Sequence, residues 1–209
     1  MKIARILIVG LLVLATAGVA EAVVLDLSAG PYAMSSVGWG LGANLSFDNV
    51  GGTRSSSAPG ALPAWIWVDL GQDYELNTVW VDCQQSSPTA CTIRLLPASL
   101  AGSENNPAAY TIVGTGSGFH TIATQNPNLR DPEGTRDTWN FATGTVTIPG
   151  NLPPGTATVN VLNPVGRYLM VYSTGSWDTG FNNISIWKIE VDVDEPPAGG
   201  TPGSLIYGK

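Results

Sequence analysis

The strongest constraint on this fold is that no apolar period near 3.6 persists for three helical turns anywhere after residue 22. Short runs rich in β-branched and aromatic residues recur instead, and Gly, Pro, Asn and Ser separate them. They lie at 65–70, 77–83, 92–96, 110–113, 144–148, 157–162, 167–173 and 184–193. The pattern predicts an all-β chain: an antiparallel β-sandwich or jelly roll of about eight strands with long loops.

The last of these runs shows how the strand faces are assigned. Odd-numbered positions from Trp187 to Val193 are apolar, and the even-numbered ones are mostly polar. Successive side chains of a strand point to opposite faces, so Trp187 is expected on the core face and Ile186 on the outer face. Residues 97–140 carry few strand signals and are expected to form long loops.

Composition excludes several classes of function. A net charge of -7 with 12% charged residues argues against a nucleic-acid binder, which needs a basic surface. One His and two Cys exclude a closed Cys/His zinc site and leave at most one Ser-His or Cys-His catalytic pair. The sequence shows no pair of carboxylates of the kind that would indicate a glycosidase. We therefore expect a protein that is not an enzyme.

The two ends of the chain are expected to lie outside the sandwich, which is assigned to residues 23–194. Lys2 and Arg5 precede an apolar run, and Ala20-Glu21-Ala22 reads as a cleavage site. Residues 1–22 are thus predicted to be a signal peptide, with an uncleaved anchor as the alternative, and the mature chain to be secreted or on the cell surface without a transmembrane segment. Residues 195–209 are expected to form a Pro/Gly-rich linker and tail: a frayed or truncated end, a tether to another domain, or a strand that pairs with a neighbouring subunit's sheet edge.

Export changes the expectation for the cysteines. Cys83 and Cys91 flank a polar segment between two strand-like runs. In an oxidising compartment a disulfide across this loop is the first expectation, and a pair of buried thiols is the alternative.

Four stretches, in the right order, resemble the discoidin family, also called coagulation factor V/VIII type C or galactose-binding-like domains. The run W-I-W-V-D-L-G from Trp65 resembles the family's W-I-Q-V-D-L-G. The stretch N-L-S-F-D-N-V-G-G-T from Asn44 resembles its N-A-F-D-G-N-x-x-T loop. The stretches V-G-R-Y-L-M-V-Y from Val165 and I-S-I-W-K-I-E-V from Ile184 resemble its two late strands.

The resemblance implies an eight-stranded jelly roll with a ligand site in loops at one end. Family members mostly bind sugars, phospholipid heads or proteins and are not catalysts. Many hold a structural calcium, whose ligands would fall here on oxygen-bearing residues of the F-D-G-N loop and of the last strand: Asp48, Asn49, Thr53 and Glu190. The family's glutamate position itself is Lys188, so either the alignment slips and Glu190 is the ligand, or the metal is lost. We expect loss, hence no cofactor, and predict that the Lys188 ammonium replaces the cation beside Asp48; the alternative is an exposed Lys188.

Sugar sites stack an aromatic ring on a pyranose and surround it with hydrogen-bonding groups. Trp39 and Trp177 are Gly-rich loop tryptophans, and the alternative for each is a ring that plugs the end of the barrel. The resemblance places both loops at the binding end. The predicted ligand-binding residues are Trp39, Arg54, Trp177, Asp178, Asn182 and Asn183.

The expected function is a secreted, non-catalytic module that binds a glycan or glycoconjugate at a cell surface or matrix. The alternative is a structural or adhesive surface or filament subunit. In that reading the C-terminal tail serves self-association or contact with a surface protein.

Overall fold

A computed structural model describes residues 22–84, 90–117, 136–147, 157–176 and 180–194. This part of the chain is all β-structure apart from three short 3₁₀ turns, and it contains no α-helix. None of its helical turns is long and apolar enough to cross a membrane. The strands are β1 (Ala22–Val24), β2 (Tyr32–Met34), β3 (Ser55–Ser56), β4 (Ala64–Cys83), β5 (Ala90–Leu96), β6 (Thr111–Ser117), β7 (Arg136–Asn140), β8 (Thr145–Thr147), β9 (Ala157–Val159), β10 (Val165–Ser173) and β11 (Ser185–Asp194).

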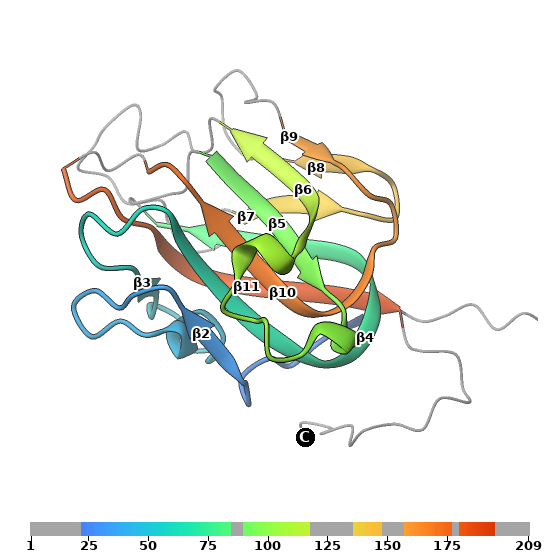
Figure 1. Cartoon of the computed structure of the whole chain (residues 1–209), viewed down its shortest axis with the longest axis horizontal. Coiled ribbons are helices and arrows are strands. Elements are labelled where there is room, and N and C mark those ends of the chain that lie inside the picture. Colours follow the sequence, from blue (N-terminus) through green and yellow to red (C-terminus); the bar gives the residue numbers. More distant parts are fainter. Residues whose placement is uncertain (1–21, 85–89, 118–135, 148–156, 177–179, 195–209) are drawn as a thin grey trace, which may run out of the picture.

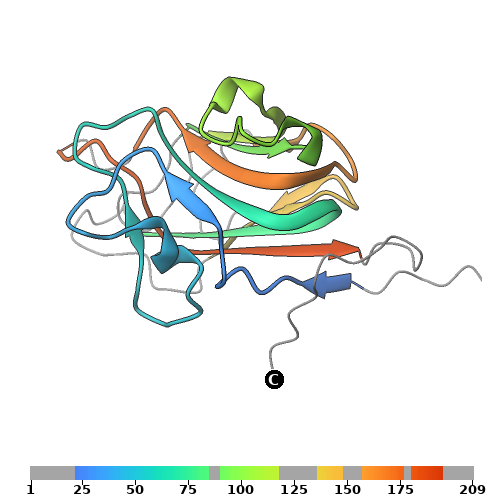
Figure 2. The same cartoon turned by 60° about the horizontal axis from the view of Figure 1, so that its bottom comes forward.

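The strands form two antiparallel layers that share β4 (Figures 1 and 2). In the first layer the order is β2-β4-β10-β5-β6-β9. In the second, β1 and β3 pair with β11, which pairs with β4, followed by β7 and β8. The predicted all-β sandwich is confirmed. The described residues contain eleven strands rather than about eight, because β1, β2, β3 and β7 carry too little pattern to be recognised in the sequence.

β4 joins the two layers because it bends in its middle. Gly71 has φ +96°, a conformation that side chains rarely adopt, and its N–H donates to the Asp69 carboxylate at 2.7 Å. Residues 64–69, before the bend, pair with β10, as do Tyr74 and Glu75 just after it, and the residues from Leu76 onward pair with β11. The two predicted strands 65–70 and 77–83 are therefore halves of one strand.

The main core fills the space between the layers. Val79 and Val81 of β4 and Ile189, Val191 and Val193 of β11 point into it and are buried. The predicted alternation of β11 is correct from residue 189 onward but wrong at its start. A register irregularity between Ile186 and Lys188 moves Ile186 into the core and leaves Trp187 half-buried.

A second cluster lies on the outer face of the first layer. Trp67, Tyr168 and Met170 are buried there under residues 97–110, which carry the turns η2 (Ala98–Leu100) and η3 (Pro107–Ala109). Trp67 Nε1 donates to Asn105 Oδ1 at 3.0 Å, which fastens this cover to β4. The beginning of the segment expected to be a long loop is thus a packed cover, visible in front of β10 and β5 in Figure 1.

The predicted disulfide is not formed. Cys83 and Cys91 are not disulfide-bonded, and both are buried. Burial, and then the neighbouring Cys83, raise the pKa of the Cys91 thiol, so Cys91 stays protonated and unreactive. The alternative of two buried thiols describes the pair.

The predicted signal peptide and the tail 195–209 lie outside the described residues, except that Ala22 begins β1 and pairs with Asp194.

Candidate functional site

Three loops that are distant in sequence meet where β10 ends and β11 begins. Gly38 N–H donates to the Ser56 carbonyl at 2.8 Å, which ties residues 35–42 to β3. Gly60 N–H donates to the Phe181 carbonyl at 2.7 Å, and Ser57 N–H to the Ile184 carbonyl at 3.0 Å. Backbone bonds therefore hold the loops around residues 39, 60 and 181 together as one surface.

Two aromatic side chains of this surface remain in solvent. Trp39 is 58% exposed and Phe181 is 53% exposed. Their ring centroids are 5.4 Å apart and the ring planes meet at 85°, an edge-to-face contact. Each ring keeps more than half of its surface open, so the pair forms an apolar platform rather than a plug over the core.

The backbone under this platform is strained. The strain lies at Trp39, which has φ +52°. A bulky residue in the left-handed region is an outlier that costs about 1–2 kcal/mol, and such residues concentrate at ligand sites. The strain at Trp39 is not offset by burial of its ring, because the ring is exposed.

Arg54 directly precedes β3, which pairs with the start of β11. Its guanidinium carbon is 5.6 Å from the centroid of the Trp187 ring on β11, a cation–π contact. This contact joins Arg54 to β11, beside the end that carries Trp39 and Phe181.

The two predicted asparagines have different environments. Asn182 is exposed beside the platform. Asn183 is only 1% exposed, and its Nδ2 donates to Ser56 Oγ at 2.9 Å and to the Ser57 carbonyl at 3.2 Å. Asn183 therefore braces two loops and is not available to a ligand, contrary to the prediction. Trp177 and Asp178 lie outside the described residues.

The predicted calcium ligands divide into two groups. Asp48 and Thr53 are together: Thr53 Oγ1 donates to Asp48 Oδ1 at 2.9 Å, and Val50 N–H donates to the same oxygen at 3.0 Å. Neighbouring Asn49 turns to Asp26, donating at 3.2 Å. Glu190 instead forms ion pairs with Lys188, at 2.9 Å, and with Arg136.

These contacts do not fit a calcium ion at this position. Glu190 is already neutralised by two cations, which leaves Asp48 as the one carboxylate of the expected set. The prediction that Lys188 faces Asp48 is wrong. Residues two apart on a strand share a face, so the ammonium of Lys188 reaches Glu190 on its own strand. Within the described residues no group of three or more His, Cys, Asp or Glu side chains could hold a metal.

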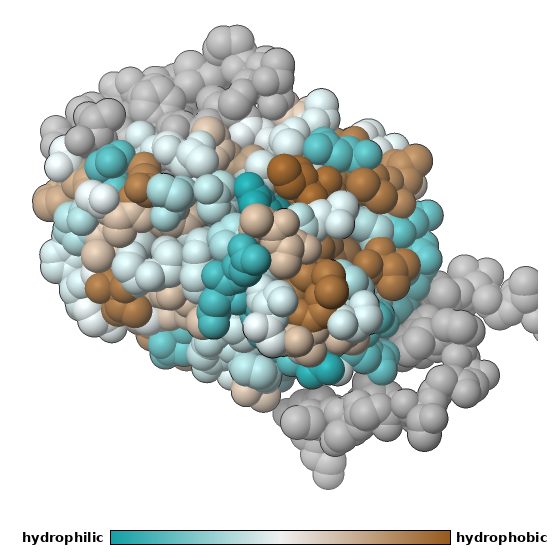
Figure 3. Space-filling model, in the orientation of Figure 1, coloured by the Kyte–Doolittle hydropathy of each residue, from teal (hydrophilic) through white to brown (hydrophobic). Residues whose placement is uncertain are grey.

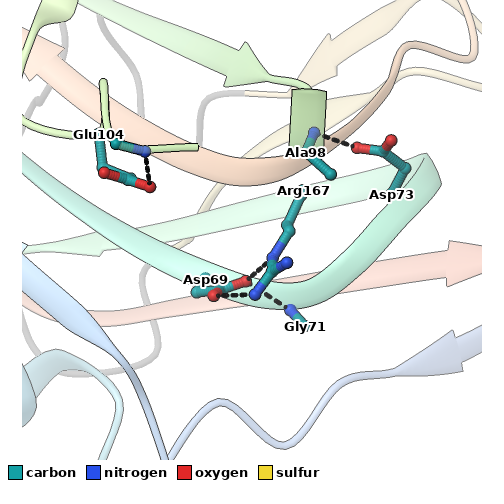
Figure 4. Close-up of polar contacts among 7 residues, drawn as sticks. Asp69, Gly71, Asp73, Ala98, Glu104 and Arg167 are labelled. Carbon is teal, nitrogen blue, oxygen red and sulfur yellow. Dashed lines mark hydrogen bonds and ion pairs between the residues drawn. The ribbon is translucent and has the colours of Figure 1, made fainter. Parts of the chain in front are cut away.

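The motifs that carried the family resemblance also meet, but away from the loops. Asp69 of the W-V-D-L-G run accepts two hydrogen bonds from Arg167, from Nε and from Nη2, each at 2.7 Å (Figure 4). The carboxylate of Asp69 raises the pKa of Arg167. This pair holds the start of β10 against the bend of β4, so these motif residues stabilise the fold.

Phe181 is the site residue that the sequence reasoning missed. It follows Gly180 in the same polar, Gly-rich loop that drew attention to Trp177. Considering every aromatic residue of that loop, rather than tryptophan alone, would have found it.

Searches against protein-family models and curated proteins find no match, whereas many solved structures resemble this chain. A variant of chitosan-binding module 1 of a chitosanase/glucanase from Paenibacillus sp. IK-5 is 22% identical, with a TM-score of 0.53; the match covers 80% of this chain and 97% of that one. The family 32 carbohydrate-binding module of C. perfringens NanJ, in complex with galactose, is 13% identical, with a TM-score of 0.52, covering 82% and 99%. CBM32-3 from a family 31 glycoside hydrolase of Clostridium perfringens is 16% identical, with a TM-score of 0.53, covering 82% and 95%.

Proposed function

We propose that this chain is an exported, non-catalytic carbohydrate-binding module of the discoidin-like kind, which binds a glycan through the loops at the β10–β11 end. Its fold is the galactose-binding-like β-sandwich of the neighbouring structures, among them a chitosan-binding module and a module in complex with galactose. At these identities the likeness shows the fold alone, so the choice of ligand class depends on the site.

The observation that carries the proposal is the exposed Trp39–Phe181 pair. Both residues keep more than half of their surface exposed, and the apolar face of a pyranose can stack on an exposed ring. Asn182, which is exposed beside the rings, supplies amide groups for sugar hydroxyls. Two large rings that stay mostly in solvent, one of them on a strained backbone, contribute little to the core, which favours a binding role.

The experiment is a glycan array followed by calorimetric titration of the best ligand against wild-type protein and three variants. We expect Trp39→Gly and Phe181→Ala to weaken binding by about tenfold or more, because each removes a stacking surface. Leu100→Ala is the matched control, because Leu100 is a similarly exposed apolar residue on η2. It should bind as wild type does.

Trp39→Gly also separates binding from structure. Glycine relieves a left-handed conformation that costs about 1–2 kcal/mol, while losing the ring contact with Phe181 costs about 0.5–1.5 kcal/mol. These effects nearly cancel, so the melting temperature should change by less than about 2 °C. A large drop in melting temperature with binding retained would show that Trp39 is structural and would contradict the proposal.

A further inference from the structure

A separate depression lies on the outer face of the first layer, between the cover 97–110 and the loop end. It has a volume of about 280 Å³ and is lined by β5, β6 and β10, with Thr92, Arg94, Thr115 and Tyr172 among its residues. That volume is at the lower end of the range of ligand sites, about 300–1,000 Å³, and suits one sugar unit. Figure 3 shows this side of the molecule, where hydrophobic surface forms separate patches and no continuous apolar face.

Arg94 is fixed in place in this depression. Its Nε donates to Thr92 Oγ1 at 2.8 Å, and its Nη1 donates to the Pro107 carbonyl of η3 at 2.8 Å. The guanidinium carbon lies 3.8 Å from the centroid of the Tyr172 ring, a close cation–π contact. Three groups from three elements therefore hold the guanidinium, so little conformational entropy remains to be lost on binding.

This cation has no carboxylate partner within the part of the chain that the structure describes, unlike Arg136 and Arg167. Its contacts use the Nε–H and one Nη1–H, which leaves the second Nη1–H and both Nη2–H groups as donors. Burial lowers the pKa of Arg94, as expected for a charge held partly out of water without an anion. An acidic chain of net charge -7 thus keeps a half-buried guanidinium in a hollow with no carboxylate paired to it among the residues described.

The hollow also offers hydroxyl groups beside the cation. Thr92 and Thr115 are cross-strand partners on β5 and β6. The Thr115 hydroxyl lies 2.7 Å from the Thr158 hydroxyl of β9, the strand that neighbours β6 in the sheet. A row of hydroxyls next to a planar cation provides both parts of a site for an acidic sugar.

We propose that this depression is a second saccharide site, selective for a uronate unit, in which the carboxylate binds the open edge of Arg94 and the sugar hydroxyls bind Thr92 and Thr115. A carboxylate matches the planar N–H fork of a guanidinium and accepts two parallel hydrogen bonds. The site is distinct from the Trp39–Phe181 platform and does not depend on it.

The test uses wild-type ¹⁵N-labelled protein, trigalacturonate and the methyl ester of the same trisaccharide, which removes only the charge. Trigalacturonate should shift the amide resonances of Thr92, Arg94, Thr115 and Gly116 with a dissociation constant of about 1 mM or tighter, and added salt should weaken binding. The ester should leave these resonances unmoved. Equal resonance shifts with both probes, or no shifts with either, would overturn the proposal. Because the experiment uses wild-type protein only, a misfolded variant cannot cause either outcome.

Variants refine the assignment. Arg94→Gln should weaken trigalacturonate binding by about tenfold or more, whereas Arg136→Gln, which removes the same charge from the other layer, should not change it. Arg94→Lys keeps the charge but loses the planar N–H fork, so this variant should bind trigalacturonate more weakly than wild type does. A variant that binds as tightly as wild type would contradict a bidentate contact with the carboxylate. Trp39→Gly should retain trigalacturonate binding, which keeps failure of this site distinguishable from failure of the loop-end site.

Discussion

Asp69 and Arg167 show at the scale of single residues how two short motifs can matter to the fold without touching a ligand. The side chain of Asp69 is 5% exposed and that of Arg167 is 32% exposed. One Asp69 oxygen also accepts the Gly71 N–H, so a single carboxylate fixes both the bend of β4 and the start of β10. Loss of the Asp69 carboxylate would leave the Arg167 guanidinium without its ion-pair partner and only partly exposed to water.

We predict that Asp69→Asn lowers the free energy of unfolding by about 2–3 kcal/mol. A fully buried ion pair loses about 3–5 kcal/mol when one partner is removed, and the partial exposure of Arg167 reduces that cost. Urea denaturation measures it through a lower midpoint at unchanged slope. Glu190→Gln is the control, because it removes a more exposed carboxylate from two ion pairs and should cost less than about 1 kcal/mol. Equal losses in the two variants would contradict this assignment.

The binding residues could be predicted from the sequence only in part. Trp39 was found because a Gly-flanked tryptophan in a loop tends to be exposed. Asn183 was misassigned because the sequence does not reveal that Ser56 and Ser57 lie against it. Phe181 and the Arg94 hollow depend on contacts between distant segments, which local patterns do not specify.

At the scale of elements, β4 is the strand on which both layers depend, and Gly71 is the residue that lets it bend. We predict that Gly71→Ala costs about 1–2 kcal/mol, because φ +96° is unfavourable for an L side chain. A Cβ at this position would meet nothing within 4 Å, so the cost is purely conformational. Thermal or urea unfolding measures it.

Two further substitutions test that explanation. Gly71→Asn should cost less than Gly71→Ala, because asparagine tolerates positive φ better than alanine does. Gln72→Ala, at the next residue, should stay within about 0.5 kcal/mol of wild type. If alanine and asparagine were equally costly at residue 71, backbone conformation would not be the cause.

The strands themselves show what local pattern can and cannot predict. Longer runs such as β5, β10 and β11 were found to within a few residues, because alternation marks them. The continuity of β4 was missed, since the polar residues around its bend read as a loop. The irregularity at Ile186 was also missed, because one extra residue in a strand leaves no mark on composition.

At the scale of the whole molecule, the two ends of the sandwich differ: one carries the candidate binding surface and the other an ion pair that stabilises the fold. The end where β10 finishes carries exposed rings, one of them on a strained backbone, and the end where β10 starts carries the Asp69–Arg167 pair. The pattern of short strand-like runs separated by turn residues predicted the fold class correctly. It could not predict the cover 97–110, whose few apolar residues become a second core only when they meet Trp67 and Tyr168.

The pH dependence of stability tests the electrostatics of the intact protein. Two carboxyl groups, Asp192 and Asp26, have pKa values shifted in opposite directions. Burial, and then the nearby Asp194, raise the pKa of Asp192. Hydrogen bonds from Ser28 lower the pKa of Asp26. The ionised form of Asp192 is therefore unfavourable in the folded state, whereas the ionised form of Asp26 is favourable.

We predict that Asp192→Asn raises the melting temperature at pH 7 and that Asp26→Asn lowers it, each by about 1–2 °C. A raised folded pKa contributes stability below the unfolded value of 3.8 that is lost as pH rises through the folded value, so the gain from Asp192→Asn is present at pH 7 and disappears in acid. A lowered folded pKa contributes stability above 3.8 that is lost as pH falls through the folded value, so the loss from Asp26→Asn also disappears in acid. Calorimetric scans at pH 7 and at about pH 2.5 measure both differences. Shifts of the same sign at pH 7, or shifts that persist unchanged in acid, would show that the substitutions act through packing rather than through charge.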